Sequence, residues 1–218
     1  MFFINPVLIL LTVLGGSFPD LDHDFRRNRV LIFILLSLIF SFLLYLFNFP
    51  IYMGLILVVL GFIFLFSSHR GFTHSLFGGL LLSFLLAFIL FFGSLFVSNL
   101  FSLFGICFNY SFLLVFILIS LFILNKYLFP LFSVFLILYA VFFNMWNFSF
   151  IVIFLALFLG FLSHIILDSF SVSGVRVFYP FYNKKFYKGF GFVLIGVLIV
   201  FSIFHFLGVF NFFNSFLF

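Results

Sequence analysis

Residues 75–97 read SLFGGLLLSFLLAFILFFGSLFV, a run without a single charged side chain. A helix needs roughly 20 consecutive apolar residues to cross the hydrocarbon core of a bilayer, so this run predicts a membrane-spanning helix. The rest of the chain has the same character: of its 218 residues, 67% are hydrophobic and only 6% are charged. This composition excludes a soluble domain, because water would contact apolar surface wherever such a chain folded.

Seven further apolar runs lie on either side of this one, and turn or polar signals such as Gly15-Gly16 and Asn48-Phe49-Pro50 separate them. The runs are residues 1–16, 30–47, 51–66, 110–124, 127–143, 149–167 and 189–213. The sequence therefore predicts an all-α, polytopic membrane bundle of about eight segments, forming a single domain over residues 1–218. If one pair of neighbouring short runs forms a re-entrant hairpin and does not span the membrane, two spanning segments are lost and six remain.

The nine basic residues all fall in loops that follow an odd-numbered segment. Cytoplasmic loops of membrane proteins carry the excess of Lys and Arg, so we expect these loops to face the cytoplasm from a multi-pass cell membrane protein. The formal charge of +5 is explained by the same rule, because basic residues beside membrane helices are orientation signals. No nucleic-acid partner is predicted.

Nearly all the acidic and imidazole side chains gather at the same loops. All four acids are Asp, and they occur with four of the five His in three clusters. The clusters are Asp20-Leu21-Asp22-His23-Asp24, His69-Arg70-Gly71-Phe72-Thr73-His74 and His164-Ile165-Ile166-Leu167-Asp168. Ionisable groups near hydrocarbon are costly and usually functional, so we expect the clusters to meet in one site at one membrane face.

The spacing within each cluster gives the expected geometry. His164 and Asp168 are four residues apart at the end of an apolar helix and should share one face. Pro19 favours an extended entry to the first cluster, in which alternate carboxylates point the same way. In the second cluster, a bend at Gly71 would let Thr73 or Ser75 cap the next helix, with His74 in its first turn.

A divalent metal explains this gathering of side chains. Carboxylates that lie close together repel one another unless a cation neutralises them, and neighbouring His supplies nitrogen ligands. The single Cys107 permits neither an intrachain disulfide nor a cysteine-built metal site. We therefore predict zinc, with manganese as the second choice, held by imidazole and carboxylate.

Each cluster also has a structural explanation when taken alone. The three Asp near position 22 could be solvated loop residues that pair with Arg26, Arg27 and Arg29. His164 with Asp168 could be a hydrogen bond between packed helices, and His69 with His74 could be interfacial polar residues. These alternatives stay open, although they do not explain why all three clusters lie at the same predicted face.

Three blocks of this sequence resemble a known family. GGSFPDLDH (15–23), HRGFTHS (69–75) and SHIILDSFSVSGV (163–175), followed by YPF (179–181), are similar to the signature blocks of the YdjM-like family of membrane-bound metal-dependent hydrolases. Ser171-Val172 stands where the family often has Thr-Pro. The family is distantly similar to zinc-dependent phospholipase C and P1-type nucleases, which implies a phosphoester substrate. The metal ligands that the resemblance implies are Asp20, Asp22, His69, His74, His164 and Asp168, with His23 as a further candidate.

The resulting hypothesis is a metal-dependent hydrolase in which metal-activated water attacks a phosphoester. Asp22 or Asp24 could orient or deprotonate the water. The residues that could receive the phosphate are Arg70, Arg176, Lys184 and Lys185. Aromatic side chains at 179–182 would lie at headgroup depth, which suggests a membrane lipid as substrate.

Two other classes of function remain open. A divalent-cation transporter usually places ionisable residues near the bilayer midplane, where this chain offers only His205. A noncatalytic membrane protein could use the same residues for a structural metal.

Overall fold

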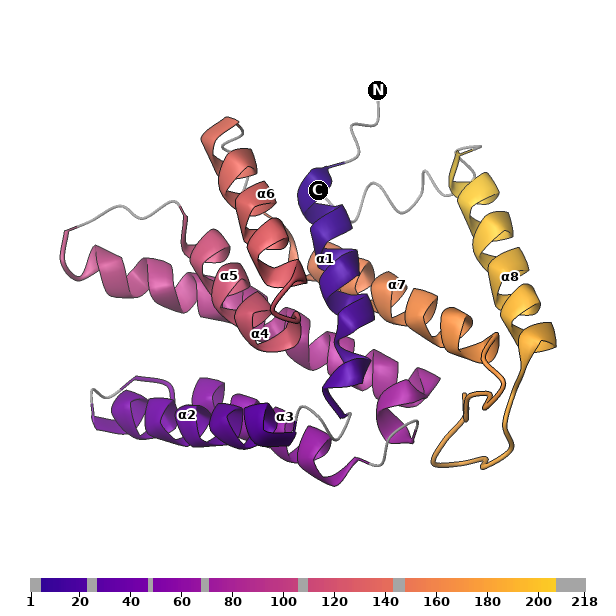
Figure 1. Cartoon of the computed structure of the whole chain (residues 1–218). Coiled ribbons are helices and arrows are strands. Elements are labelled where there is room, and N and C mark those ends of the chain that lie inside the picture. Colours follow the sequence, from indigo (N-terminus) through magenta and orange to yellow (C-terminus); the bar gives the residue numbers. More distant parts are fainter. Residues whose placement is uncertain are drawn as a thin grey trace.

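The structure, a computed structural model, describes residues 5–22, 27–46, 49–67, 71–105, 110–142 and 148–206. Over these residues the chain is helical and contains no strand, which confirms the all-α prediction. The α-helices are α1 (Pro6–Ser17), α2 (Arg27–Leu46), α3 (Tyr52–Phe66), α4 (Leu76–Ser102), α5 (Ser111–Ile123), α6 (Leu128–Phe142), α7 (Phe150–Ser169) and α8 (Lys188–Phe206). Two short 3-10 helices, η1 (Pro19–Asp22) and η3 (Phe72–His74), follow α1 and precede α4 (Figure 1).

Helix length separates two of these helices from the others. Within the described parts of the chain, α4 and α7 alone are long and apolar enough to cross a membrane. At 1.5 Å per residue, α7 is about 30 Å long, which matches the hydrocarbon core, whereas α1 is about 18 Å long. Of the roughly eight predicted membrane segments, two are thus supported as spans. The other six helices are apolar, but the helix or its apolar part is shorter than a span.

The helices pack in a chain of neighbours. α1 lies against α7, α7 against α4, and α4 against α5, while α2 and α3 form an antiparallel hairpin (Figure 1). The hairpin contacts the rest mainly through α3 and α4, and Phe33 of α2 also packs against Phe122 of α5. Leu11 and Leu14 of α1, Leu157 and Phe161 of α7 and Leu82 of α4 are fully buried between these helices. Their burial fixes α1, α4 and α7 as one packed unit.

Glycine allows α1 and α7 to approach closely. A Cβ atom at Gly160 would contact the carbonyl oxygen of Thr12, and one at Gly15 would contact the carbonyl oxygen of Leu157. Small residues at helix contacts let membrane helices pack backbone to backbone. Gly15-Gly16, predicted to break the first segment, instead lies inside α1, which continues to Ser17 because the pair packs against α7.

A long loop connects α7 to α8 and returns to the start of α4. Val175 and Phe186 form an isolated antiparallel bridge within it. The N–H of Leu76 donates to the carbonyl of Val177 at 2.8 Å, and Val177 is completely buried. The loop is therefore anchored two residues from His74.

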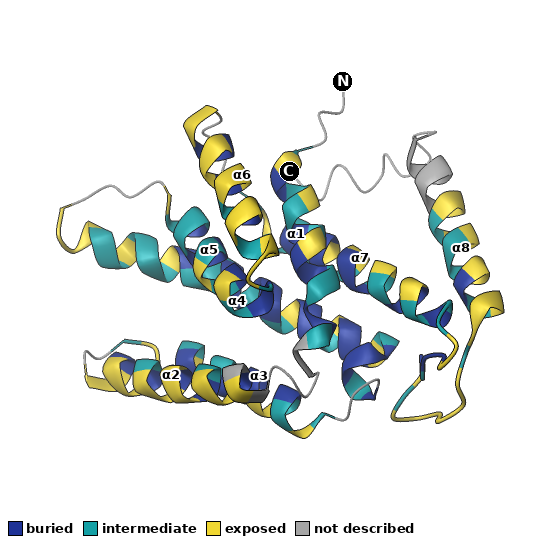
Figure 2. Cartoon of the chain, in the orientation of Figure 1, coloured by how far each residue is buried: buried dark blue, intermediate teal, exposed yellow. Residues whose placement is uncertain are grey.

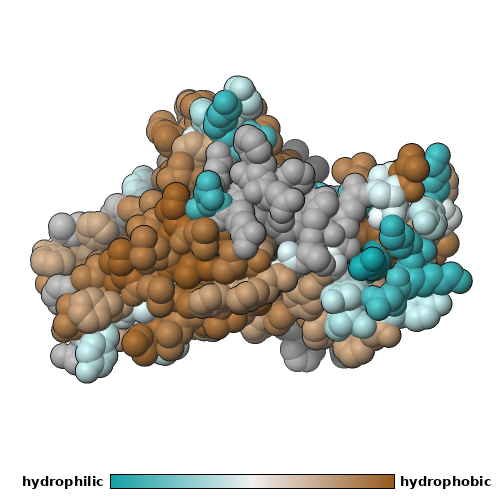
Figure 3. Space-filling model, turned by 60° about the horizontal axis from the view of Figure 1, so that its bottom comes forward, coloured by the Kyte–Doolittle hydropathy of each residue, from teal (hydrophilic) through white to brown (hydrophobic). Residues whose placement is uncertain are grey.

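Most of the outward surface of the helices is apolar. Leu35 of α2, Phe135 of α6 and Phe192 of α8 are each more than half exposed, and Figure 2 shows exposed positions along these outer helices. In Figure 3, hydrophilic atoms gather at one end, over the loop between α7 and α8. Lipid contact explains such a surface, since soluble proteins rarely expose large contiguous apolar patches.

Candidate metal centre

The first cluster lies directly after α1. Asp20 occupies the second position of η1, the 3-10 helix that begins at Pro19. The predicted extended entry is therefore wrong, because proline is well suited to the first turn of a helix, where its missing N–H costs nothing. Asp20 on this turn points towards α7, with its Oδ1 3.6 Å from His164 Nε2.

The second cluster supplies His74 from just before α4. His74 ends η3, and Ser75 caps α4 by accepting a hydrogen bond from the N–H of Gly78 at 3.0 Å. The prediction of Ser75 as a cap is confirmed. His74 lies one residue outside the helix rather than in its first turn, because the cap position must be non-helical.

The third cluster lies on the last two turns of α7. His164 and Asp168 share one face as predicted, with His164 Nε2 and Asp168 Oδ2 3.5 Å apart. The two residues are therefore presented by a rigid helix rather than by a loop.

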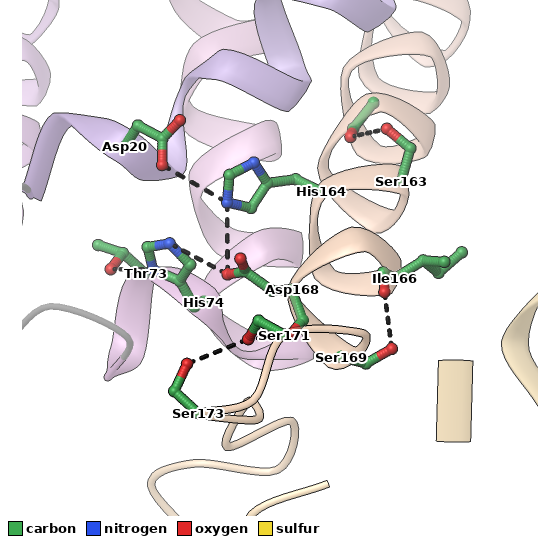
Figure 4. A network of polar contacts seen from close by, with 11 residues as sticks. Asp20, Thr73, His74, Ser163, His164, Ile166, Asp168, Ser169, Ser171 and Ser173 are labelled. Carbon is green, nitrogen blue, oxygen red and sulfur yellow. Dashed lines mark hydrogen bonds and ion pairs between the residues drawn. The ribbon is translucent and has the colours of Figure 1, made fainter. Parts of the chain in front are cut away.

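The three segments meet, and their polar atoms surround one point (Figure 4). His164 Nε2 lies 3.6 Å from Asp20 Oδ1, and His74 Nε2 lies 3.5 Å from Asp168 Oδ2. Asp20, His74 and His164 each offer one ligand atom within 4.8 Å of the other two, and the two imidazole ring centroids are 5.1 Å apart. Asp168 contacts both histidines, so four side chains from three segments form one cluster.

Burial within the cluster is graded from one side to the other. The side chain of His74 is 1% exposed and those of His164 and Asp168 are 15% and 17% exposed, whereas Asp20 is 49% exposed. The histidines are thus shielded by packing, and the cluster opens to the outside next to Asp20. A ligand entering the site would arrive on that side.

Neighbouring groups hold the two imidazole rings in place. The carbonyl of Gly16 accepts a hydrogen bond from His164, and the Thr73 hydroxyl lies 3.2 Å from His74 Nδ1. The Ser67 hydroxyl in turn donates to Thr73 Oγ1 at 3.2 Å. Metal-binding histidines are typically oriented in this way through the nitrogen that does not bind the metal. The sequence did not predict that Gly16 and Ser67 help to orient these imidazole rings. Small or hydroxylated residues beside the clusters could have indicated it.

The donor set fits a divalent metal such as zinc. Two ligands about 2.1 Å from a tetrahedral zinc lie about 3.4 Å from each other, close to the 3.5–3.6 Å between the nitrogen and oxygen atoms of this cluster. Charge-assisted hydrogen bonds between the same groups would be nearer 2.8 Å. In addition, the polar neighbours of the buried His164 Nε2 are carboxylate oxygens of Asp20 and Asp168, at 3.6 and 3.5 Å, which a cation could bridge.

Some predicted site residues are not placed by the structure. His23, Asp24, His69 and Arg70, together with the side chain of Asp22, lie outside the described residues. The roles predicted for them as ligands, catalytic carboxylates or phosphate-binding groups therefore stay predictions.

The remaining predicted phosphate-binding residues belong to the loop between α7 and α8. Arg176 is half-buried and adjoins Val177, the residue bonded to the start of α4, whereas Lys184 and Lys185 are exposed. The antiparallel bridge of Val175 with Phe186 makes Arg176 and Lys185 the next residues in register.

These features define a class of protein: a helical membrane protein with a His and Asp cluster where three helix ends meet. A family model described as "YdjM inner membrane protein" matches residues 3–216. The chain therefore belongs to the YdjM inner membrane protein family. No match was found among curated proteins or among solved structures. The likeness to zinc-dependent phospholipase C and P1-type nucleases stays a prediction.

Proposed function

We propose that this protein is a metal-dependent hydrolase of the inner membrane that cleaves a phosphoester, with a lipid headgroup as its substrate. The observation that carries the proposal is the group of Asp20, His74 and His164, whose ligand atoms all lie within 4.8 Å of one another, with Asp168 3.5 Å from both histidines. Membership of an inner membrane family supports the location.

The side chains have separate roles in the proposed reaction. Asp20, His74 and His164 hold the metal, with Asp168 as a further ligand, and α7 keeps two of these side chains in fixed geometry. When bound, a divalent cation polarises the phosphoryl oxygen and lowers the pKa of water towards neutrality. Asp22 or Asp24 orients the attacking water and accepts its proton.

The loop between α7 and α8 supplies the substrate contacts. Arg176, Lys184 and Lys185 balance the negative charge of the phosphate, with Arg70 as a further candidate, while exposed aromatic residues such as Phe181 and Tyr182 lie at headgroup depth. The anchoring of this loop beside His74 supports the assignment.

We also propose the orientation. All nine basic residues follow odd-numbered helices, which favours a polytopic arrangement with the cluster on the cytoplasmic face. The described end of α1, start of α4 and end of α7 meet at one end of the packed unit, which is consistent with one membrane face (Figure 1).

The proposal is tested on the full chain purified in detergent. Bound zinc and manganese are measured by mass spectrometry, and phosphomonoesters, phosphodiesters and phospholipids are screened for hydrolysis. Wild type should retain metal and cleave one substrate class, whereas Asp20→Ala and His164→Ala should lose at least 100-fold in turnover while keeping the helical circular-dichroism spectrum.

Three results would overturn the proposal. Equal hydrolysis by wild type and His164→Ala would assign the activity to a contaminant. Metal binding without hydrolysis, with unfolding of His164→Ala, would show a structural metal instead. Metal uptake into liposomes without ester cleavage would identify a transporter.

A further inference from the structure

An apolar pocket lies between the α2–α3 hairpin and helices α4 and α5. Side chains from all four helices line it, together with the residue that follows α1; they include Phe18, Phe33, Leu57, Phe64, Leu86 and Ile119. None of the described side chains that line it is polar. The cavity itself is small, about 40 Å³ of space that the centre of a water-sized sphere can reach, so it admits a narrow group rather than a whole headgroup.

One lining residue of this pocket lies close to the candidate metal centre along the chain. Phe18 lies two residues before Asp20, and its ring packs edge-on against Phe64 with 4.9 Å between ring centroids. Two residues of extended chain span about 7 Å at most, so the pocket begins next to the most exposed ligand of the cluster. A molecule whose polar end reached Asp20 could extend its other end past Phe18.

The chemistry of the pocket selects its occupant. Water needs two to four polar partners to be held in a cavity, and a polypeptide would leave backbone groups without hydrogen bonds. A hydrocarbon chain needs none. The outer faces of α2 and α3 are also apolar, with Leu35 and Val59 more than half exposed, so the surroundings of the pocket are suited to lipid.

We infer that the pocket binds an acyl chain of the lipid substrate and so places its phosphoester at the metal centre. This inference rests on the proposed function, and it adds the recognition of a hydrophobic tail to the recognition of a phosphate. For short-chain substrates dissolved in water, each methylene lost from the pocket should then weaken binding about three- to fourfold.

The test fills the pocket and leaves the cluster intact. Leu57→Trp adds bulk on the lining face of α3, and Leu55→Trp adds the same bulk on the exposed face of that helix. Ile119→Trp and Leu118→Trp form a second matched pair on α5, in case Leu57→Trp does not fold. Each protein is placed in phosphatidylcholine vesicles with phosphatidic acid that carries a diazirine in its acyl chain, and cross-links are mapped by mass spectrometry.

We expect wild type and both exposed-face variants to form cross-links at the lining positions. In the pocket-filling variants, the yield of these cross-links should fall at least fivefold. Zinc content should be equal in all proteins that fold. Equal cross-linking in the two members of a pair would overturn the inference.

Turnover distinguishes this failure from failure of the proposed function. With a phosphoester that the enzyme cleaves, Leu57→Trp should raise KM for the long-chain form and leave the chain-free form unchanged. Equal KM effects on both forms would overturn the inference and leave the hydrolase standing. Pocket-dependent cross-linking with no hydrolysis of any phosphoester would instead overturn the hydrolase and retain an acyl site.

Discussion

The contact between α1 and α7 and the contact between α2 and α3 both depend on glycine, yet they produce different surroundings. Gly160 lets α7 approach the backbone of α1, and Gly54 lets α3 approach Ser41 of α2. At the end of the first contact, backbone and side-chain polar groups converge on His164. The second contact forms one wall of an apolar pocket. Close helix packing alone therefore does not create a metal site. Whether polar or apolar surroundings result depends on the side chains at the neighbouring helix ends.

The largest expected effect comes from adding a methyl group at Gly160. Gly160→Ala places a Cβ against the carbonyl of Thr12 and 2.9 Å from the backbone nitrogen of Gly16, neither of which can move independently of α1. Overpacking costs about 1–3 kcal/mol, so the melting temperature in detergent should fall by several degrees and zinc binding should be lost. Gly196→Ala in α8 is the control, because nothing lies within 4 Å of that position. Equal stability of the two variants would show that α1 and α7 do not pack this closely.

The next prediction concerns the carboxylate that contacts both histidines. Asp168→Asn keeps the shape of the side chain and removes its charge 3.5 Å from each imidazole Nε2. Zinc affinity measured by competition with a chelator should fall 10- to 100-fold or more, with no change in helix content. Ser163→Ala, on an exposed position of the same helix, should bind zinc as wild type does. Unchanged affinity in Asp168→Asn would exclude Asp168 as a ligand.

A smaller effect on zinc affinity is expected from Thr73, which contacts the ring nitrogen of His74 that faces away from the cluster. Thr73→Val removes the hydroxyl beside His74 Nδ1 and ends the contact from Ser67. Because His74 would keep its place but lose its orientation, zinc affinity should fall about 10-fold. Ser102→Ala, at the exposed end of α4, removes a hydroxyl that bonds only locally and serves as the control. If Thr73→Val and Ser102→Ala lowered stability equally in zinc and in chelator, the hydroxyl at 73 would have only a structural role.

Much of the fold could be predicted from hydrophobicity alone. The runs at 110–124 and 149–167 correspond closely to α5 and α7, because long apolar segments in a bilayer have no stable alternative to helix. The function of Gly15-Gly16 could not be predicted in the same way. Glycine ends a helix in one context and permits a close helix contact in another, and only the position of α7 decides between them.

The candidate site was predictable as a meeting of three segments, but not in its details. His164 and Asp168 followed from helical spacing. The position of Asp20 depended on η1, which local rules for proline did not anticipate, because they compare extended and α-helical backbone and neglect the 3-10 turn. The apolar pocket had no signal in the sequence, because its lining residues belong to runs that are apolar on every face.

The smallest effect that the comparison predicts is at the cap of α4. Ser75→Ala removes the hydroxyl that accepts from the N–H of Gly78, which should destabilise the protein by about 1 kcal/mol. The loss should be measurable as a shift of a few degrees in melting temperature in detergent. Ser75 adjoins His74, so the cap also fixes the position of this histidine before α4. The shift in melting temperature should therefore be larger when zinc is present. Ser133→Ala removes a hydroxyl bonded to a carbonyl of α6, a helix that contributes no residue to the cluster, and its shift should be the same with zinc and with chelator. If zinc changed the shift equally in the two variants, the cap at Ser75 would have no influence on metal binding.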